Sequence, residues 1–134
     1  MHFIDTNIFL RYLTNDDAEK AKKVFLLLKK VEEGKEKVTT SPLVIFELIF
    51  TLDKFYKVSR KDIGEMTTAI INLEGLVVEF KDTFISALKL FAEKNISFTD
   101  AFNASIMKSK GITKIYSYDA DFDKIDKIER IEEP

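Results

Sequence analysis

The sequence predicts an α/β fold in which short parallel strands alternate with helices that cover both faces of a sheet. Short apolar pieces rich in β-branched and aromatic residues alternate with longer segments of helical periodicity. Strands that are joined through helices pair in parallel. The chain has 134 residues, 46% of them hydrophobic, and only 4 Gly and 2 Pro. This is enough apolar material for one core, so we expect a single domain over residues 1–134 and exclude disorder.

Local signals place the elements at the start of the chain. Residues 2–4 predict a strand that ends at Asp5, and residues 7–13 predict a short helix. Asp16 is expected to cap a longer helix, and Gly34 is expected to end it.

The middle of the chain begins with a β-branched strand at residues 38–40. Ser41-Pro42 is a helix cap followed by proline at the first helical position, which predicts a helix to about residue 56. Ser59 begins the next helix, and Gly75 is expected to end it. The remaining elements are, in order, a strand at 76–80, a helix from Asp82 or Thr83 to Asn95, a helix opened by residues 97–100 and closed by Gly111, a strand at 114–118 and a short strand at 128–131.

Composition excludes several kinds of chemistry. The chain has no Cys and a single His, at position 2, which rules out disulfides, a Ser–His–Asp triad and zinc sites built on thiolates or several histidines. The net charge of −2 is not that of a nucleic-acid binder that acts through bulk charge. No stretch approaches the ~20 apolar residues of a membrane span, and the N-terminus lacks a signal peptide. We therefore expect a cytoplasmic protein with no membrane association.

Glu47 is the only charge between Pro42 and Leu52, in a helix that is apolar on all faces. We expect this helix to be largely buried. Two interpretations of Glu47 stay open. It is either a carboxylate that is exposed at the rim or paired with a lysine, or one that faces a cleft where a cation compensates its charge.

Three aspartates raise the same question. Asp5 and Asp119 each follow a strand, and the carboxyl ends of parallel strands are where ligands bind. Asp100 opens a helix, where an acid is also a common first-turn residue. It shares a helical stripe with Asn103, Ala104 and Met107, so Asn103 is a candidate to orient it. Taken singly, each acid has an equally good structural interpretation as a cap or turn residue.

The run Asp119-Ala-Asp121-Phe-Asp123 also needs a test against the EF-hand loop, which begins in the same way. That loop requires Gly at its sixth position and Glu at its twelfth, and here those positions hold Lys124 and Arg130. The EF-hand interpretation fails. Asp121 and Asp123 then have a solvated acidic turn as their simplest interpretation.

Carboxylates from separate segments, with no Cys and no ligating His, suit a hard cation such as Mg²⁺ or Mn²⁺. Such a site can activate water and hold a phosphate for in-line displacement. A phosphodiester is the natural substrate, because its non-bridging oxygens complete the coordination of the metal. The set that supports this is Asp5, Glu47, Asp100 and Asp119.

In this order along the chain, the motifs resemble those of PIN-domain ribonucleases, and the length and element order resemble the VapC-type toxins of toxin–antitoxin pairs. The motifs are residues 3–7, Glu47 in its apolar helix, residues 98–101 and residues 117–122. The resemblance covers essentially the whole chain. It implies a three-layer α/β/α sandwich with a short, mainly parallel central sheet, and a metal-dependent endoribonuclease that leaves a 5′-phosphate and a 3′-hydroxyl.

The resemblance also implies roles for individual residues. The catalytic, metal-binding acids are Asp5, Glu47, Asp100 and Asp119, with Asp121 as a further metal ligand, and Thr6, Asn7 and Ser117 support them. The implied cofactor is Mg²⁺ or Mn²⁺, and the implied partners are an RNA substrate, a small antitoxin protein and a second copy of the chain.

Two other hypotheses compete with a ribonuclease. A receiver-like phosphoacceptor domain needs an acidic pair after the first strand, where this chain has Asp5-Thr6-Asn7. A catalytically silent PIN-like scaffold that acts by binding protein or RNA is the second, and the complete set of acids argues against it. Candidate phosphate contacts are Arg11, Lys20, Lys22, Lys23, Lys108 and Lys110, all of which also suit a solvated helix face.

Overall fold

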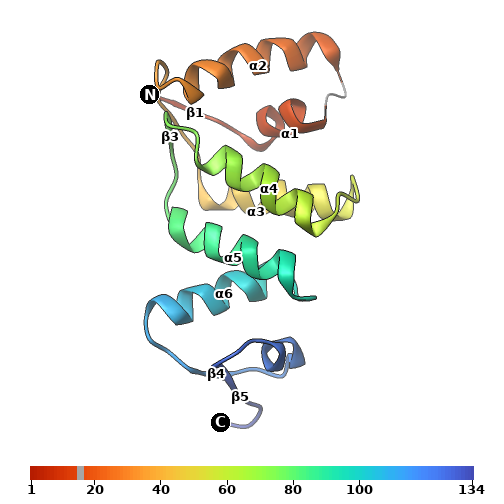
Figure 1. The fold of residues 1–134 in the computed structure, drawn as a ribbon, viewed down its shortest axis with the longest axis vertical. Helices are drawn as coiled ribbons and strands as arrows, with labels where there is room; N and C mark the ends of the chain where they lie inside the picture. The colour runs from red at the N-terminus through yellow and green to blue at the C-terminus, as the bar shows by residue number, and fades with distance from the viewer. Residues whose placement is uncertain (15–16) are drawn as a thin grey trace. The chain divides into compact units, whose positions relative to one another are not determined.

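A three-stranded parallel sheet belongs to the first of two units into which the chain divides, residues 1–81 and 82–134. The structure, a computed structural model, describes residues 1–14 and 17–134 (Figure 1). The first unit comprises β1 (His2–Phe3), α1 (Thr6–Thr14), α2 (Ala18–Glu32), β2 (Val38–Thr39), α3 (Pro42–Lys54), α4 (Arg60–Ile71) and β3 (Leu76–Val77).

The sheet of the first unit has the order β1-β2-β3, with every pair parallel. Two threonine hydroxyls extend the pairing beyond the backbone ladder. Thr40 Oγ1 donates to the carbonyl of Ile4 at 2.7 Å, and Thr39 Oγ1 donates to the carbonyl of Val77 at 2.8 Å. The predicted parallel pairing and the α/β class are confirmed.

The helices of the first unit begin at capping side chains. Ser41 and Ser59 cap α3 and α4 as predicted, each accepting a hydrogen bond from a backbone N–H three residues on. For α2 the cap is Asp17, which accepts from the N–H of Lys20 at 3.1 Å, so the expectation of a cap at Asp16 is wrong; Asp16 itself lies outside the described residues.

Gly75 has a different role from the predicted one. Helix α4 ends at Ile71, and Gly75 lies beyond it, directly before β3. Its N–H donates to the carbonyl of Val31 at 2.8 Å. A Cβ at this position would overlap the carbonyl oxygen of Glu36 and come within 2.9 Å of that of Val31. Glycine is therefore required by the close approach of backbone segments and not by the end of a helix.

The second unit comprises α5 (Lys81–Glu93), α6 (Phe98–Ser109), β4 (Lys114–Tyr116), the 3₁₀ helix η1 (Ala120–Lys124) and β5 (Glu129–Ile131). Its two strands pair in parallel, with Ile115 opposite Arg130. Ser97 caps α6, and Gly111, at φ 68°, follows its end as predicted. Strands β3 and β4 are shorter than predicted, and the structure assigns the strands to two sheets, one in each unit.

Aromatic side chains hold α5 and α6 of the second unit together. The rings of Phe84 and Phe98 stack with their centroids 6.2 Å apart, and Phe91 meets Phe98 edge-on at 5.9 Å. Phe84 and Phe91 are almost fully buried. Since aromatic pairs of this kind add to the gain from burial, they fix the start of α6, the helix that carries Asp100.

Candidate metal centre

Three carboxylates of the second unit converge. Asp100, Asp119 and Asp121 each offer an oxygen, and these oxygens lie within 4.8 Å of one another. Asp100 lies in the first turn of α6, Asp119 follows β4, and Asp121 lies in η1. We call these three residues the acidic cluster.

The position of Asp100 follows from the local sequence around it. Ser97 Oγ accepts the N–H of Asp100 at 3.1 Å, which fixes the first turn of α6. Phe98 and Ala101, on either side of Asp100, are buried, so the backbone is anchored while the carboxylate is only half-buried. The Asp100 carboxylate therefore meets those of Asp119 and Asp121 from an anchored helix end.

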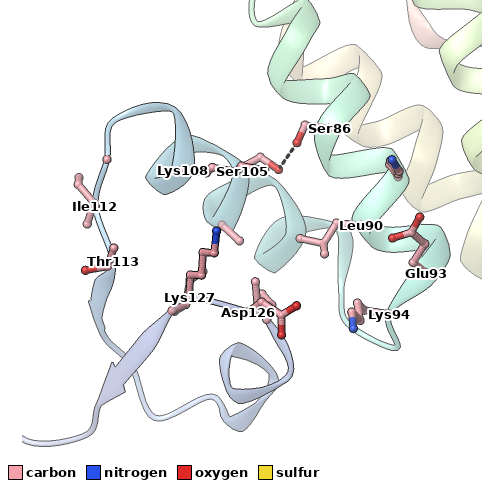
Figure 2. Close-up of a pocket in the computed structure, with 15 residues that line it drawn as sticks. Ser86, Leu90, Glu93, Lys94, Ser105, Lys108, Ile112, Thr113, Asp126 and Lys127 are labelled. Carbon is pink, nitrogen blue, oxygen red and sulfur yellow. Dashed lines mark hydrogen bonds between the residues drawn. The ribbon is translucent and has the colours of Figure 1, made fainter.

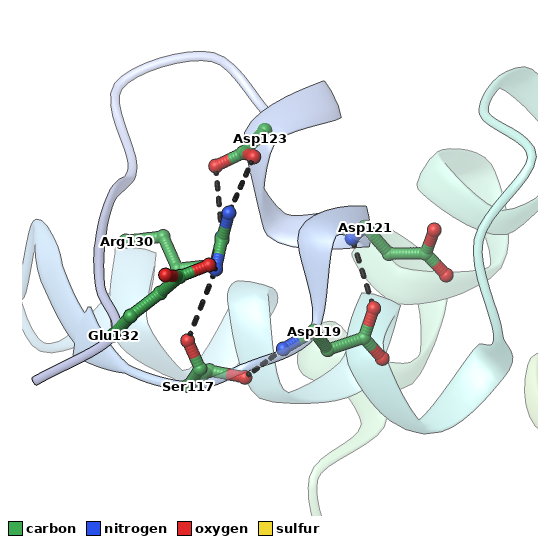
Figure 3. Close-up of polar contacts among 6 residues, drawn as sticks. All are labelled: Ser117, Asp119, Asp121, Asp123, Arg130 and Glu132. Atoms are coloured by element: carbon green, nitrogen blue, oxygen red, sulfur yellow. Dashed lines mark hydrogen bonds and ion pairs between the residues drawn. The ribbon is translucent and has the colours of Figure 1, made fainter.

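Asp119 and Asp121 are arranged by a tight turn (Figure 3). Ser117 Oγ accepts the N–H of Asp119 at 3.0 Å, and Asp119 Oδ1 accepts the N–H of Asp121 at 2.9 Å. Phe122, next to Asp121, is buried and anchors the turn. The two carboxylates thus point to the same side of the turn.

The carboxylates of the acidic cluster repel one another, and this affects the pKa of Asp100. Burial raises the pKa of Asp100, and the hydrogen bond and charge of Asp119 and the charge of Asp121 raise it further, against the hydrogen bond from Ser97. A divalent cation would relieve this repulsion. Because all the donors are carboxylate oxygens, the cluster fits Mg²⁺ or Mn²⁺.

Lys124 already neutralises part of the acidic cluster. Its Nζ lies 3.0 Å from Asp121 Oδ1 and donates to the carbonyl of Asn95 at 2.9 Å. Both side chains of the pair are partly exposed. Among the contacts described, the ammonium of Lys124 therefore offsets part of the charge of Asp121.

The other two predicted acids lie in the first unit. Asp5 follows β1 and is exposed, and its Oδ1 accepts the N–H of Thr6 at 2.8 Å. Glu47 lies on α3 and is also exposed. The structure brings together Asp100, Asp119 and Asp121, and the participation of Asp5 and Glu47 in the same centre stays a prediction.

Helix α3, which was expected to be largely buried, has one buried face and one exposed face. Val44 and Leu48 are buried, but Leu43 is 77% exposed and Phe50 is 65% exposed. Glu47 lies four residues after Leu43 and three before Phe50, on the same face of the helix. Its carboxylate therefore bears little cost of burial, and the argument that a cation must compensate a buried charge does not apply to it.

The supporting residues have varied surroundings. Thr6 is buried, and its hydroxyl has no hydrogen-bond partner among residues 1–14 and 17–134. Asn7 and Asn103 are exposed. Asn103 shows no hydrogen bond to Asp100 among the contacts described, so its predicted orienting role finds no support there.

The other members of the predicted α6 stripe belong to the core. Ala104 is 3% exposed and Met107 is 8% exposed. These two residues of the stripe therefore have a packing role, and Asp100 is the member that belongs to the acidic cluster.

Apart from the acidic cluster, the second unit has a cavity of about 520 Å³ between α5, α6 and the segments that precede β4 and β5 (Figure 2). Its charged lining residues are Lys89, Glu93, Lys94, Lys108, Asp126 and Lys127. Ser105 Oγ and Ser86 Oγ are 3.4 Å apart across α6 and α5. Of the candidate phosphate contacts, Lys108 lines this cavity, which mixes lysines with carboxylates.

Sequence reasoning gave Arg130 no role at the site: it occurs there as a residue of the strand expected at 128–131 and as a mismatch to the EF-hand loop. Its guanidinium makes two hydrogen bonds to the carboxylate of Asp123, at 3.0 and 2.9 Å, and one to Glu132 at 2.6 Å. The alternation of acids and bases near the C-terminus is the only signal in the sequence, and it does not say which charges pair.

Comparison with known proteins identifies the family. The model of the PIN domain matches residues 2–128, which span both units. The chain belongs to the PIN-domain family. This PIN domain is 30% identical over 125 residues to a VapC ribonuclease of Aquifex aeolicus, a match that covers 93% of this chain and 92% of the relative. The resemblance to VapC proteins inferred from the motifs is therefore confirmed.

Among solved structures, this PIN domain is similar to VapC20 of Mycobacterium tuberculosis, described as a sarcin-ricin loop cleaving toxin. The two are 25% identical, with a TM-score of 0.38 and coverage of 92% of this chain and 94% of that one. In the part of the chain that the structure describes, no helix has both the length and the apolar character needed to cross a membrane.

Proposed function

We propose that this PIN domain is a Mg²⁺- or Mn²⁺-dependent endoribonuclease and the toxin of a toxin–antitoxin pair, with all of residues 1–134 acting as a single nuclease domain. The observation that carries the proposal is the acidic cluster, whose oxygens lie within 4.8 Å of one another. The kinship to a VapC ribonuclease supports the choice of RNA as substrate.

In this proposal each acid has a defined task. Asp100, Asp119 and Asp121 hold the metal, and Asp5 and Glu47 complete its carboxylate ligands. When bound, the metal lowers the pKa of a water and offsets charge that develops on the phosphate. Ser117 and Thr6 fix the backbone next to Asp119 and Asp5, since Ser117 Oγ accepts the N–H of Asp119 and the N–H of Thr6 donates to Asp5.

The products and partners follow from the same proposal. Attack by water on the phosphodiester leaves a 5′-phosphate and a 3′-hydroxyl. A small antitoxin protein and a second copy of the chain are the proposed protein partners. A panel of structured RNAs is a rational first set of substrates, because the chain is kin to a VapC ribonuclease and its own target sequence is not specified by any motif.

The test combines cleavage with metal binding. Purified wild-type protein is incubated with a panel of structured RNAs in Mg²⁺ or Mn²⁺, with EDTA as the metal-free arm. Asp100→Asn removes one cluster ligand, and Glu129→Gln, on an exposed residue of β5, is the matched control. Binding of Mn²⁺ is followed in parallel by electron paramagnetic resonance.

Cleavage that needs metal, survives in Glu129→Gln and is lost in Asp100→Asn is the expected result. Cleavage by Asp100→Asn at the wild-type rate would refute the assignment of the centre. Binding of RNA or a protein partner without metal binding or cleavage would favour the silent scaffold instead.

A further inference from the structure

We propose that Arg130 is a positioning residue that holds the acidic turn, residues 117–123, in the shape required for metal binding. This inference rests on the proposed metal centre and assigns a task to a residue outside it. Among the contacts described, Arg130 bonds to none of the three carboxylates of the acidic cluster. It acts on the segment that carries two of them.

One guanidinium contacts both ends of the acidic turn (Figure 3). At the start, Arg130 Nη1 donates to the carbonyl of Ser117 at 3.3 Å. At the end, Nε and Nη2 donate to the two carboxylate oxygens of Asp123. Asp119 and Asp121 lie between these two points. We call Arg130 with Ser117, Asp123 and Glu132 the arginine clamp.

The clamp is itself held by the sheet. Arg130 is the middle residue of β5, opposite Ile115 of β4. Beyond the paired residues, the N–H of Ser117 donates to the carbonyl of Ile131 at 3.1 Å, which keeps Ser117 beside Arg130. The Arg130 side chain is only 13% exposed, so its orientation is restricted by its surroundings.

The shape of the acidic turn determines where the carboxylates of Asp119 and Asp121 lie. Ser117, whose carbonyl Arg130 binds, uses its hydroxyl to accept the N–H of Asp119, and Asp119 in turn accepts the N–H of Asp121. A shift of Ser117 therefore moves the carboxylates that depend on it. Groups that orient metal ligands from outside the coordination shell commonly change metal affinity when they are lost.

Geometry and charge make opposite predictions for Arg130. If the residue acted only through its positive charge, its removal would strengthen cation binding at the acidic cluster. If it acts through geometry, substitutions that keep every charge but change the arrangement of the guanidinium donors or of their acceptors will weaken cation binding. Lysine cannot reproduce the arrangement, because it presents a single ammonium in place of planar donors in a fixed fork.

The experiment therefore uses charge-preserving variants. Arg130→Lys changes the donor fork, and Asp123→Glu moves the carboxylate that it binds, so either variant tests the clamp if the other does not fold. Glu129→Asp, next to Arg130 on β5, is the control. Mn²⁺ affinity is measured by electron paramagnetic resonance in the absence of RNA, at a temperature where melting curves show each variant to be folded.

Mn²⁺ binding about ten-fold weaker in Arg130→Lys and Asp123→Glu, with Glu129→Asp unchanged, is the expected result. Wild-type affinity in the two clamp variants, even with lower melting temperatures, overturns the inference, because Arg130 then only stabilises the fold. Tighter binding also overturns it. Absence of Mn²⁺ binding in the wild-type protein refutes the proposed function instead, so the two failures are distinguishable.

Discussion

The acidic cluster and the arginine clamp share one short stretch of the second unit and the same type of residue, but their charges are handled in opposite ways. In the clamp, Asp123 receives two hydrogen bonds from Arg130, which hold the pKa of Asp123 below its usual value. In the cluster, burial and neighbouring carboxylates raise the pKa of Asp100. The comparison teaches that the partners of a carboxylate indicate its task better than its sequence motif does.

The largest expected effect tests the cluster side of the comparison. Asp119→Asn removes a ligand whose Oδ1 also accepts the N–H of Asp121. RNA cleavage, measured as kcat/KM, should fall by on the order of 100-fold or more, because charge stabilisation at the reacting phosphate is lost. Asp126→Asn, on an exposed residue outside the cluster, should cleave normally. Equal losses in the two variants would contradict the assignment.

The second effect is the stabilisation of the folded protein by metal. At a Mn²⁺ concentration about 100 times the dissociation constant, binding should add about 2.7 kcal/mol to the free energy of unfolding. That corresponds to a rise of roughly 10 °C in melting temperature for a chain of this size. Scanning calorimetry should show the rise for wild type and little of it for Asp100→Asn. An equal rise in both proteins would mean that the metal binds elsewhere.

The third effect concerns how Asp100 and Asp123 contribute to the free energy of unfolding of the metal-free protein. The two contributions should depend on pH with opposite signs. The pKa of Asp100 in the folded protein is raised above its ordinary value of 3.8, so ionisation of this group disfavours folding. This penalty to the free energy of unfolding develops as pH rises from 3.8 to the raised pKa. The pKa of Asp123 is lowered, so its contribution is favourable above 3.8 and is lost as pH falls through its folded value.

Near pH 7, Asp100→Asn should therefore raise the free energy of unfolding, by roughly 1 kcal/mol or less for a half-buried group, and Asp123→Asn should lower it. Both differences should shrink at pH values well below 3.8. Urea denaturation across this pH range measures them. If both substitutions changed the free energy of unfolding in the same direction near pH 7, the proposed difference between cluster and clamp would be wrong.

The smallest effect concerns Lys124. Its ammonium donates to Asp121 Oδ1 at 3.0 Å. A cation bound to the same oxygen would compete with this interaction. Lys124→Gln should therefore tighten Mn²⁺ binding, by roughly two- to five-fold, as expected for a partly exposed ion pair. Lys114→Gln, on β4, is the control. Weaker binding in Lys124→Gln would show that the lysine helps to hold the ligands instead of competing with the metal.

Features that depend on a few neighbouring residues were predicted well from the sequence. The caps at Ser41, Ser59 and Ser97 follow from local hydrogen bonding, and the glycines at 34 and 111 adopt the positive φ that helix ends favour. The parallel pairing follows from the alternation of strands and helices. The misplaced cap of α2 shows the limit, because two consecutive aspartates offer the same chemistry.

Features that depend on distant segments were not predictable in this way. The requirement for glycine at 75 comes from the backbone of residues 31 and 36. The pairing of Arg130 with Asp123 requires β5 to lie beside β4. The exposure of Leu43 and Phe50 depends on which face of α3 finds a partner, and an apolar sequence does not specify that.

Within the candidate site, the sequence identified Asp100 and Asp119 from their places at a helix start and a strand end, and the structure brings them together with Asp121. Asp121 lies in a turn, as its simplest interpretation had it, and the N–H of Asp121 donates to Asp119, whose carboxylate lies close to its own. Motif spacing alone does not reveal such a turn.

The contact at Gly75 also bears on genetics. In a random-mutagenesis screen that selects for lost activity, substitutions at residue 75 should be recovered as often as those at Asp119, because any side chain would collide with the carbonyl of Glu36. The screen alone would then not distinguish Gly75, which is needed for backbone packing, from the proposed metal ligands. Scoring the abundance of soluble protein in each hit would separate them, since Asp119 variants should accumulate normally and Gly75 variants should be depleted.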